Sequence, residues 1–265
     1  MEPTTDLARA DILGVGIHAI NMRQAVLAID DAARNRRKGY VCVTGVHGVM
    51  EAQSDGEFKT ILNYSLLTTP DGMPTVWVGR LQGFREMDRV YGPDLMLEVC
   101  RISEERGYSH FLYGGNDGVV EKLAGSLRVR YPKLNIVGMR TPPFRSLNAT
   151  EELALREHVR KTRPDFMWVG LSTPKQERFM AGHIGTLDCT LMLGVGAAFD
   201  IHTGSTKDAP HWVKRAGLQW LHRFLQEPRR LWKRYLLNNP RFIWNIFMQV
   251  LRQGFTARSA GELGK

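Results

Sequence analysis

The sequence is poor in the residue patterns that hold metal ions or disulfides. Its three cysteines, Cys42, Cys100 and Cys189, lie far apart and form no Cys-x-x-Cys pair, and each falls within or beside an apolar run. The eight histidines include no His-Glu-x-x-His motif or other ligand spacing. These absences argue against a disulfide framework and against a structural zinc ion. We expect three reduced cysteines in the core of a cytoplasmic protein.

Long apolar runs are also absent. Residues 1–16 contain acidic side chains and no apolar core, so we expect no secretory signal. The longest apolar run near the end, residues 242–251, is interrupted by Asn245 and Gln249 and has about half of the roughly 20 residues that a membrane-spanning helix needs. The sequence therefore predicts no membrane span.

Positive charge is in excess, and the excess is confined to the last quarter of the chain. Residues 207–265 contain twelve Lys and Arg against three Asp and Glu, whereas residues 1–206 contain 24 charges of each sign. The formal net charge of +9 therefore belongs to residues 207–265. Such a segment must meet an anionic partner or be held in solution by its own charge. We divide the chain into a catalytic body, residues 1–206, and a basic, helical C-terminal appendage, residues 207–265.

Strand-like runs alternate with helical segments along the body. Apolar runs lie at residues 40–44, 65–69, 110–113, 135–139, 166–170 and 190–193, and most lead through a loop into a helix of ten to fifteen residues. Asn21 and Asn148 stand where N-caps are expected, the latter with capping-box spacing. This alternation predicts a Rossmann-like α/β fold, in which helices cover both faces of a parallel sheet.

Ligands of such sheets bind at the loops that follow the strands, and three of these loops carry suitable groups. The candidates for substrate binding are Gly114, Gly115, Asn116, Lys175, Gln176, Glu177, Gly196 and Asp200. The glycines let the backbone approach a ligand, the helix start after Pro174 attracts anions, and a carboxylate can accept hydroxyl hydrogen bonds from a sugar. They outline a nucleotide or sugar site, although packing explains a glycine-rich strand exit equally well.

Asp71 is the sharpest single candidate for catalysis. It lies in a Pro-Asp-Gly turn directly after a strand, where a carboxylate can take a proton from an attacking hydroxyl. Pro-Asp-Gly is also favoured in turns for purely local reasons, so a structural role stays open. Asp94, which follows Tyr-Gly-Pro, can touch substrate or cap the next helix, and capping is the simpler explanation.

Complete nucleotide motifs are missing. Gly14-x-Gly16 lacks the third glycine of GxGxxG because that position is Ala19, and no GxxxxGK[ST] occurs, so an NAD-dependent Rossmann oxidoreductase is kept only as an alternative. Asp-x-Asp, which many sugar-nucleotide enzymes use to hold a divalent ion, is absent too. The phosphates of a sugar nucleotide would then be neutralised by amides and basic side chains. The appendage offers Arg223, Arg230, Lys233 and Arg234 for this role.

The appendage has a pattern of its own. It holds four of the six tryptophans and leucines at helical spacing, and Pro228 and Pro240 are predicted to divide it into about three helices. Apolar residues opposite Lys and Arg are typical of helices that lie in a membrane interface. A solvated basic face packed on the body explains the same pattern, and so a non-catalytic basic membrane-binding module is a further alternative. Nucleic-acid binding is not indicated, because no nucleic-acid motif accompanies the charge.

Several blocks in order resemble the WecB/TagA/CpsF family of bacterial glycosyltransferases, glycosyltransferase family 26. They include VTGVHGVMEA, LLTTPDGMPTVWVGR, YGPDLM, FLYGGNDGVVEKLA, WVGLSTPKQERFMAGH, GVGAAFDIHTG and NNPRF, and the resemblance covers residues 12–247. It implies an inverting transfer, without metal or other cofactor, of a sugar from a UDP-sugar to a saccharide carried by polyprenyl diphosphate. The enzyme would be peripheral on the cytoplasmic face of the inner membrane and act in surface polysaccharide or exopolysaccharide synthesis.

The resemblance also implies residue roles. Asp71 would be the general base on the acceptor hydroxyl, and Thr44 and Gln176 would line the sugar pocket. Arg223, Arg230 and Lys233 would belong to an appendage that closes the active site over the diphosphate and docks on an anionic membrane.

The chain departs from the family pattern at two places. Members often place an Asn just after the Thr of the first block, whereas this chain has Gly45-Val46-His47, which makes His47 a candidate ligand contact. Lys233 stands where others have Arg; it keeps the charge but loses the bidentate fork, and Arg234 can take that role. The donor sugar stays open between glucose, N-acetylmannosamine and its uronic acid, and a homo-oligomer stays open as well.

Overall fold

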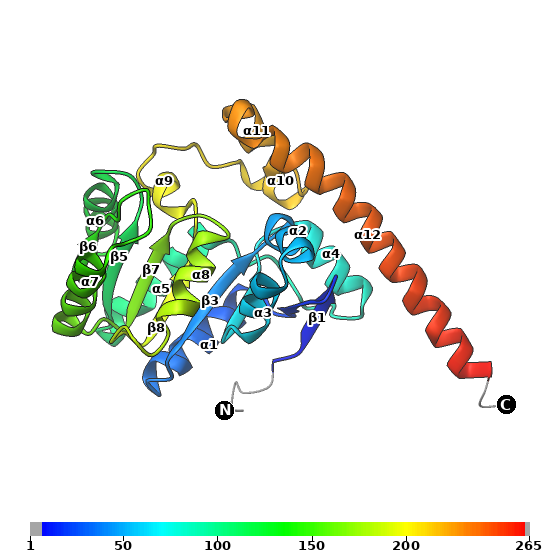
Figure 1. The fold of residues 1–265 in the computed structure, drawn as a ribbon, viewed down its shortest axis with the longest axis horizontal. Helices are drawn as coiled ribbons and strands as arrows, with labels where there is room; N and C mark the ends of the chain where they lie inside the picture. Colours follow the sequence, from blue (N-terminus) through cyan, green and yellow to red (C-terminus); the bar gives the residue numbers. More distant parts are fainter. Residues whose placement is uncertain (1–6, 263–265) are drawn as a thin grey trace.

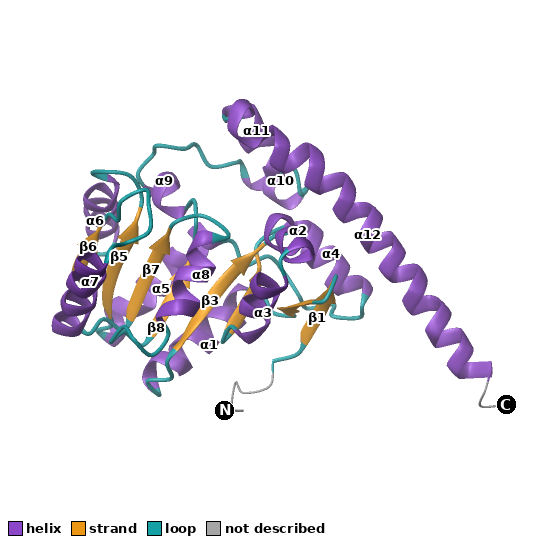
Figure 2. Cartoon of the chain, in the orientation of Figure 1, coloured by secondary structure: helices purple, strands orange, loops and turns teal. Residues whose placement is uncertain are grey.

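A six-stranded parallel sheet forms the centre of the protein. The computed structural model describes residues 7–262, without the side chains of residues 230, 233, 234 and 253–262. The strands are β3 (Gly39–Thr44), β4 (Leu67–Pro70), β5 (Ser109–Gly114), β6 (Asn135–Arg140), β7 (Phe166–Gly170) and β8 (Leu191–Gly194). Their order is β4-β3-β8-β7-β5-β6, and every pair is parallel. The predicted Rossmann-like α/β fold is confirmed (Figures 1 and 2).

Helices cover both faces of this sheet because strand side chains alternate between two apolar layers. On one face, Val41, Leu112 and Trp168 pack against α1 (Met22–Arg34), α5 (Gly92–Arg106), α6 (Val119–Arg130) and α9 (Ala198–His202). On the other, Cys42 and Met167 pack against α2 (Val46–Ser54), α3 (Gly56–Tyr64), α7 (Ala149–Thr162) and α8 (Lys175–His183). The three cysteines are buried and unbonded to one another, as expected.

Two predicted helix starts are confirmed by their caps. The Asn21 side chain accepts a hydrogen bond from the Gln24 amide and the Gln24 side chain returns one, which completes a capping box at α1. Asn148 and Glu151 do the same at α7. Each box satisfies amides that the first helical turn leaves without partners.

A hairpin precedes the sheet, and the sequence pattern did not predict it. Strands β1 (Arg9–Ile12) and β2 (Val15–His18) pair antiparallel, with Ile12 opposite Val15. Leu13 and Gly14 form the turn with positive φ values of 56° and 81°, as a type I′ turn requires. The apolar run at residues 12–15 therefore bends instead of extending, because its centre is the turn.

The appendage folds into α10 (His211–Arg215), α11 (Gln219–Gln226) and the long α12 (Pro228–Glu262), which pass over the end of β3 and alongside α2 and α4 (Met73–Leu81) (Figure 1). The prediction that Pro240 ends a helix is wrong, because α12 continues through it. A proline inside a helix costs roughly 3 kcal/mol. Phe242 and Ile246 lie just beyond Pro240 and are 4% and 9% exposed, so their burial against the body offsets that cost.

None of the helices within residues 7–262 combines the length and the hydropathy needed to cross a membrane.

Candidate active site

A cavity of about 480 Å³ lies between the body and the appendage. Its floor comes from the end of β3, the first turn of α2 and the turn after β4, including Thr44, His47 and Asp71, and its roof comes from α10, α11 and α12. In an open parallel sheet, ligands bind at the carboxyl ends of the strands, and this cavity lies there. Its volume falls within the roughly 300–1,000 Å³ of small-molecule sites.

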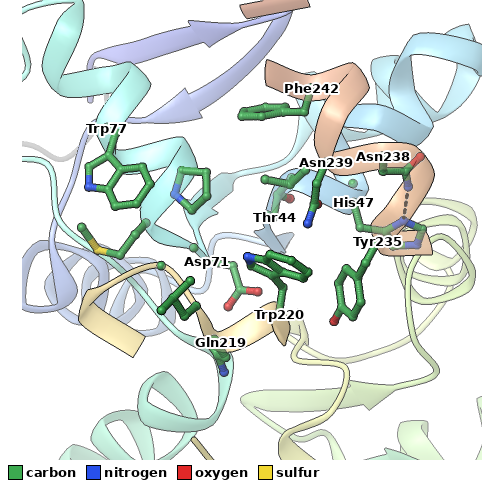
Figure 3. Close-up of a pocket in the computed structure, with 18 of the residues that line it drawn as sticks. Thr44, His47, Asp71, Trp77, Gln219, Trp220, Tyr235, Asn238, Asn239 and Phe242 are labelled. Atoms are coloured by element: carbon green, nitrogen blue, oxygen red, sulfur yellow. Dashed lines mark hydrogen bonds between the residues drawn. The ribbon is translucent and has the colours of Figure 1, made fainter. Parts of the chain in front are cut away.

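Asp71 enters the cavity because of the strand register. Thr44 is paired with Pro70 at the ends of β3 and β4, so Asp71, the first residue after β4, leaves the sheet beside Thr44. The Asp71 amide donates to the Thr44 carbonyl at 3.1 Å, which fixes the start of the Pro-Asp-Gly turn. The Asp71 carboxylate is half-buried, and Gly92 N lies 3.4 Å from its Oδ1. Figure 3 shows this carboxylate among the side chains of the cavity. Asp71 thus has both the turn geometry and the access that a base needs.

Two polar groups at this cavity lack a partner within the described part of the chain. The Thr44 hydroxyl oxygen is buried in a residue that is 2% exposed, and it makes no hydrogen bond there. Nε of Arg223, on α11, is also buried without a hydrogen-bond partner among the described residues. Buried polar atoms without partners cost free energy and are uncommon in folded proteins. A ligand with hydroxyl or phosphate oxygens would satisfy both.

The roof contributes side chains that the sequence analysis missed. Trp220 of α11 and Tyr235 of α12 line the cavity with ring centroids 5.8 Å apart. Asn238 lies 3.4 Å from the His47 ring, Nδ2 to Nδ1, and so joins α12 to the first turn of α2 (Figure 3). Asn238 and Asn239 fall inside the NNPRF block, which was the only sequence signal for them.

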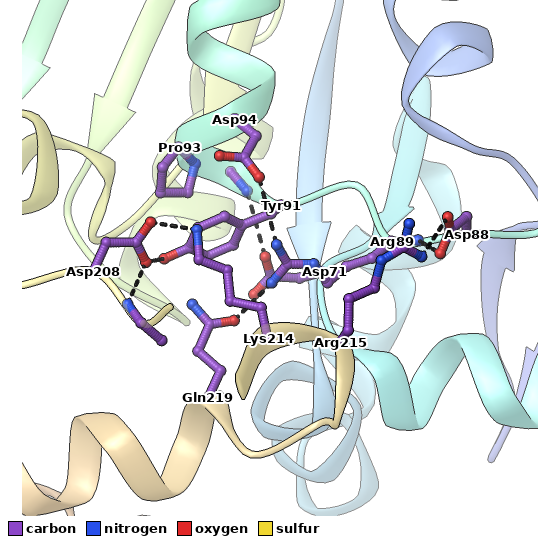
Figure 4. Close-up of polar contacts among 12 residues, drawn as sticks. Asp71, Asp88, Arg89, Tyr91, Pro93, Asp94, Asp208, Lys214, Arg215 and Gln219 are labelled. Carbon is purple, nitrogen blue, oxygen red and sulfur yellow. Dashed lines mark hydrogen bonds and ion pairs between the residues drawn. The ribbon is translucent and has the colours of Figure 1, made fainter. Parts of the chain in front are cut away.

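Tyr91 links the body to the first part of the appendage. Its hydroxyl donates to Asp208 Oδ1 at 2.9 Å, and Asp208 also pairs with Lys214, whose ammonium lies 4.7 Å from the Tyr91 ring centroid (Figure 4). Burial raises the pKa of Tyr91, and the negative charges of Asp208 and Asp71 raise it further. The Tyr91 hydroxyl therefore stays protonated and acts as a donor.

Further polar contacts hold α10 and α11 on the body. Arg89 Nη1 donates to Gln219 Oε1 at 2.9 Å, and Arg215 Nη1 lies 3.2 Å from Asp88 Oδ2 (Figure 4). An exposed ion pair such as that between Arg215 and Asp88 contributes only about 0–1 kcal/mol. The burial of Phe242 therefore contributes more to the docking of the appendage on the body, and the polar contacts fix the orientation of α10 and α11.

Gln176 and Glu177 are buried behind Thr173, a residue that lines the cavity. They are 2% and 1% exposed. Gln176 Oε1 accepts from the Gly196 amide at 3.0 Å and its Nε2 donates to Glu177 Oε1, which also accepts from the Thr173 hydroxyl at 2.8 Å. Thr173 lines the cavity. This network brings the loops after β7 and β8 together.

The remaining predicted residues of the body do not line this cavity. Asp94 lies in the first turn of α5, where it makes no cap hydrogen bond, and its Oδ2 lies 3.4 Å from Arg89, so the capping explanation is wrong. Gly114 packs on the Gly170 backbone and Gly115 on Val119, as close-packing positions do. The side chains of Asn116 and Lys175 are exposed, and Asp200 is on α9.

Three predicted cations of the appendage have side chains outside the described part of the structure. Arg230, Lys233 and Arg234 belong to α12, but their side chains lie outside the described residues. Among the described residues, no group of three or more His, Cys, Asp or Glu is arranged to hold a metal ion.

Comparison with known proteins adds to this geometry. Residues 10–256 match the family described as "Glycosyl transferase WecG/TagA/CpsF family". Two similar proteins bear the name N-acetylglucosaminyldiphosphoundecaprenol N-acetyl-beta-D-mannosaminyltransferase. The one from Bacillus subtilis (strain 168) is 26% identical over 198 residues, 75% of each chain. The one from Staphylococcus aureus (strain MW2) is 25% identical over 248 residues, which are 93% of this chain and 95% of that protein.

Proposed function

Because the chain belongs to the WecG/TagA/CpsF family of glycosyl transferases, we propose that it moves a sugar from a UDP-sugar to a saccharide carried by polyprenyl diphosphate. The transfer inverts the anomeric carbon, uses no metal ion, and serves bacterial surface polysaccharide or exopolysaccharide synthesis. The names of the two relatives support the acceptor class, since both specify an N-acetylglucosaminyl group on diphosphoundecaprenol.

One observation carries the proposal: a carboxylate of the body and a cation of the appendage line the same cavity. Asp71 is positioned to remove the proton from the acceptor hydroxyl as its oxygen attacks the anomeric carbon. The bond from that carbon to the UDP oxygen breaks, and the diphosphate leaves with the electron pair. Arg223 is positioned to stabilise the charge that develops on the leaving group. A base and a stabilised leaving group are what a single displacement through an oxocarbenium-like state requires.

The other proposed contacts follow the position of each residue. The unpartnered Thr44 hydroxyl and the His47 ring are proposed to contact the transferred sugar. Gln176 would act through the Gly196 loop that it holds. We propose that Arg230, Lys233 and Arg234 join Arg223 in binding the diphosphate of the UDP-sugar. The absence of Asp-x-Asp supports charge neutralisation by these cations.

Membrane docking through the appendage is part of the proposal. Three apolar side chains of the appendage are largely exposed: Trp212 of α10 (69%), Leu225 of α11 (71%) and Trp244 of α12 (62%). Arg229 and Arg241 of α12 are exposed as well. Exposed apolar side chains beside cations bind the interface of anionic membranes. This location, on the cytoplasmic face of the inner membrane, would bring the cavity to a lipid-linked acceptor.

The test is a transfer assay with purified protein, a short-chain lipid-diphosphate N-acetylglucosamine acceptor, and a panel of UDP-N-acetylmannosamine, its uronic acid and UDP-glucose. We expect one donor to give a product with UDP release that persists in EDTA. Failure of every donor and acceptor would refute the proposal. UDP, and not NADH, should raise the melting temperature, which separates it from a dinucleotide-dependent oxidoreductase. Removing residues 211–265 should abolish both turnover and binding to anionic vesicles. Loss of vesicle binding with turnover retained would show that the appendage is only a membrane anchor.

A further inference from the structure

The cavity has two chemically different sides. Around Asp71, the side toward His47, Tyr235 and Asn238 is polar, and the opposite side carries Trp77 (Figure 3). The apolar lining residues come from α4, the loop before α11, and α12; they are Met73, Pro74, Trp77, Val78, Leu218, Phe242, Ile243 and Ile246. The sugar chemistry of the proposed function uses only the polar side.

This apolar side opens to the surface instead of closing as core. Ile243 is 69% exposed and Trp77 is 45% exposed, although both line the cavity. Leu81, one helical turn beyond Trp77 on α4, is 76% exposed, and Phe247, one turn beyond Ile243 on α12, is 52% exposed. Exposed apolar side chains therefore continue from the cavity along both α4 and α12. Exposed apolar surface of this kind is costly unless something covers it.

We propose that the apolar side, formed by α4 and α12, binds the isoprene units next to the diphosphate of the lipid-linked acceptor. The inference rests on the proposed function. The order of groups in such an acceptor, a saccharide, then a diphosphate, then a hydrocarbon chain, matches the order of polarity from Asp71 toward Trp77 and Ile243. A cavity of about 480 Å³ holds a drug-sized ligand, so only the first units of a long chain fit. The rest leaves along Leu81 and Phe247 toward the membrane.

The geometry also accounts for the position of the appendage loop. Gly217 has φ +71°, and a Cβ there would lie 2.6 Å from the Trp77 ring. Because Gly217 has no side chain, the loop can lie close to Trp77, which lines the cavity and is 45% exposed. Trp77 lines the apolar side of the cavity from α4, and Ile243 lines it from α12.

The experiment compares two soluble acceptors with the full-length enzyme, without membranes or detergent. Both carry N-acetylglucosamine diphosphate, one esterified to geraniol, which supplies two isoprene units, and the other to methanol. The measured quantity is the ratio of their kcat/KM values. Ile243→Gln should lower this ratio about tenfold, the order expected for losing apolar contact with one large aliphatic side chain. Because Ile243 is mostly exposed, the variant should fold, which its melting temperature verifies.

Val250→Gln is the matched control. Val250 lies two turns further along α12, is 48% exposed and does not line the cavity, so the ratio should stay at the wild-type value. A ratio unchanged in Ile243→Gln, an equal fall in Val250→Gln, or a wild-type enzyme that does not prefer the geranyl acceptor would each overturn the inference. A wild-type enzyme that transfers sugar to neither acceptor would instead refute the proposed function.

Discussion

Replacing Asp71 by Asn separates its two roles, turn residue and base. The amide keeps the size of the side chain and one acceptor oxygen, and the backbone bond from the Asp71 amide to Thr44 is unaffected. Asn keeps an oxygen that can accept the long bond from Gly92 N, at 3.4 Å, so the variant should still fold. Asn cannot accept the hydroxyl proton. Loss of general-base assistance lowers rates by about 10²–10⁴-fold, or roughly 3–5 kcal/mol in the activation free energy.

The assay measures kcat for UDP release with saturating donor and acceptor, beside the melting temperature of each variant. Asp188→Asn is the control, because Asp188 is exposed, pairs with Lys38 and Arg163, and does not line the cavity; its kcat should stay within twofold of wild type. Near-normal turnover of Asp71→Asn would show that Asp71 is a turn residue only. An Asp71→Asn protein that lost its fold would lead to the same conclusion.

Three further outcomes are expected. Burial lowers the pKa of His18 from 6.5 to about 4, so below pH 6.5 the unfolded chain gains a proton on this residue while the folded protein keeps it neutral. The free energy of unfolding should therefore fall by about 3 kcal/mol between pH 6.5 and 4. In denaturant titrations, His18→Asn should lack this pH-dependent loss of stability. Gly217→Ala should lower the melting temperature and kcat/KM more than Gly204→Ala. Both glycines have positive φ, but only at Gly217 would an added Cβ meet the Trp77 ring. Equal effects of the two substitutions would show that backbone strain alone is responsible. Arg223→Gln should raise KM for the UDP-sugar at least tenfold, and an unchanged KM would remove Arg223 from the diphosphate site.

Most of the sheet could be predicted because its signals are local. Phe166–Gly170 and Leu191–Gly194 are continuous apolar runs followed by loops that contain Ser, Thr, Pro or Gly, and both are buried parallel strands. Asn21 and Asn148 marked helix starts because capping depends on residues within one turn. Asp71 was identifiable because the turn and the strand before it are contiguous in sequence.

The errors and omissions involve competition between local preference and distant packing. Pro240 should end a helix, but the burial of Phe242 and Ile246 on the body holds α12 together. Leu13 has no turn preference, yet Gly14 beside it allows a turn that lets Ile12 and Val15 reach the core.

The roof of the cavity could not be predicted from pattern for the same reason. Trp220, Tyr235 and Asn238 are unremarkable positions of amphipathic helices until those helices dock on the sheet edge. Only contacts across long sequence separations, such as that between His47 and Asn238, select which face of α12 is turned inward. The family resemblance indicated that the appendage closes the site, but it did not identify these side chains.

The division of the cavity between an early and a late part of the chain has a consequence for biosynthesis. Residues 43–91 and Thr173 supply the floor, and the roof comes from residues beyond 210, which leave the ribosome after them. A nascent chain can complete the sheet, since β8 ends at Gly194, while the cavity still has no roof. Ligand binding that needs both halves therefore begins only after the roof residues have been synthesised, and a chain that stops before them lacks half of the cavity.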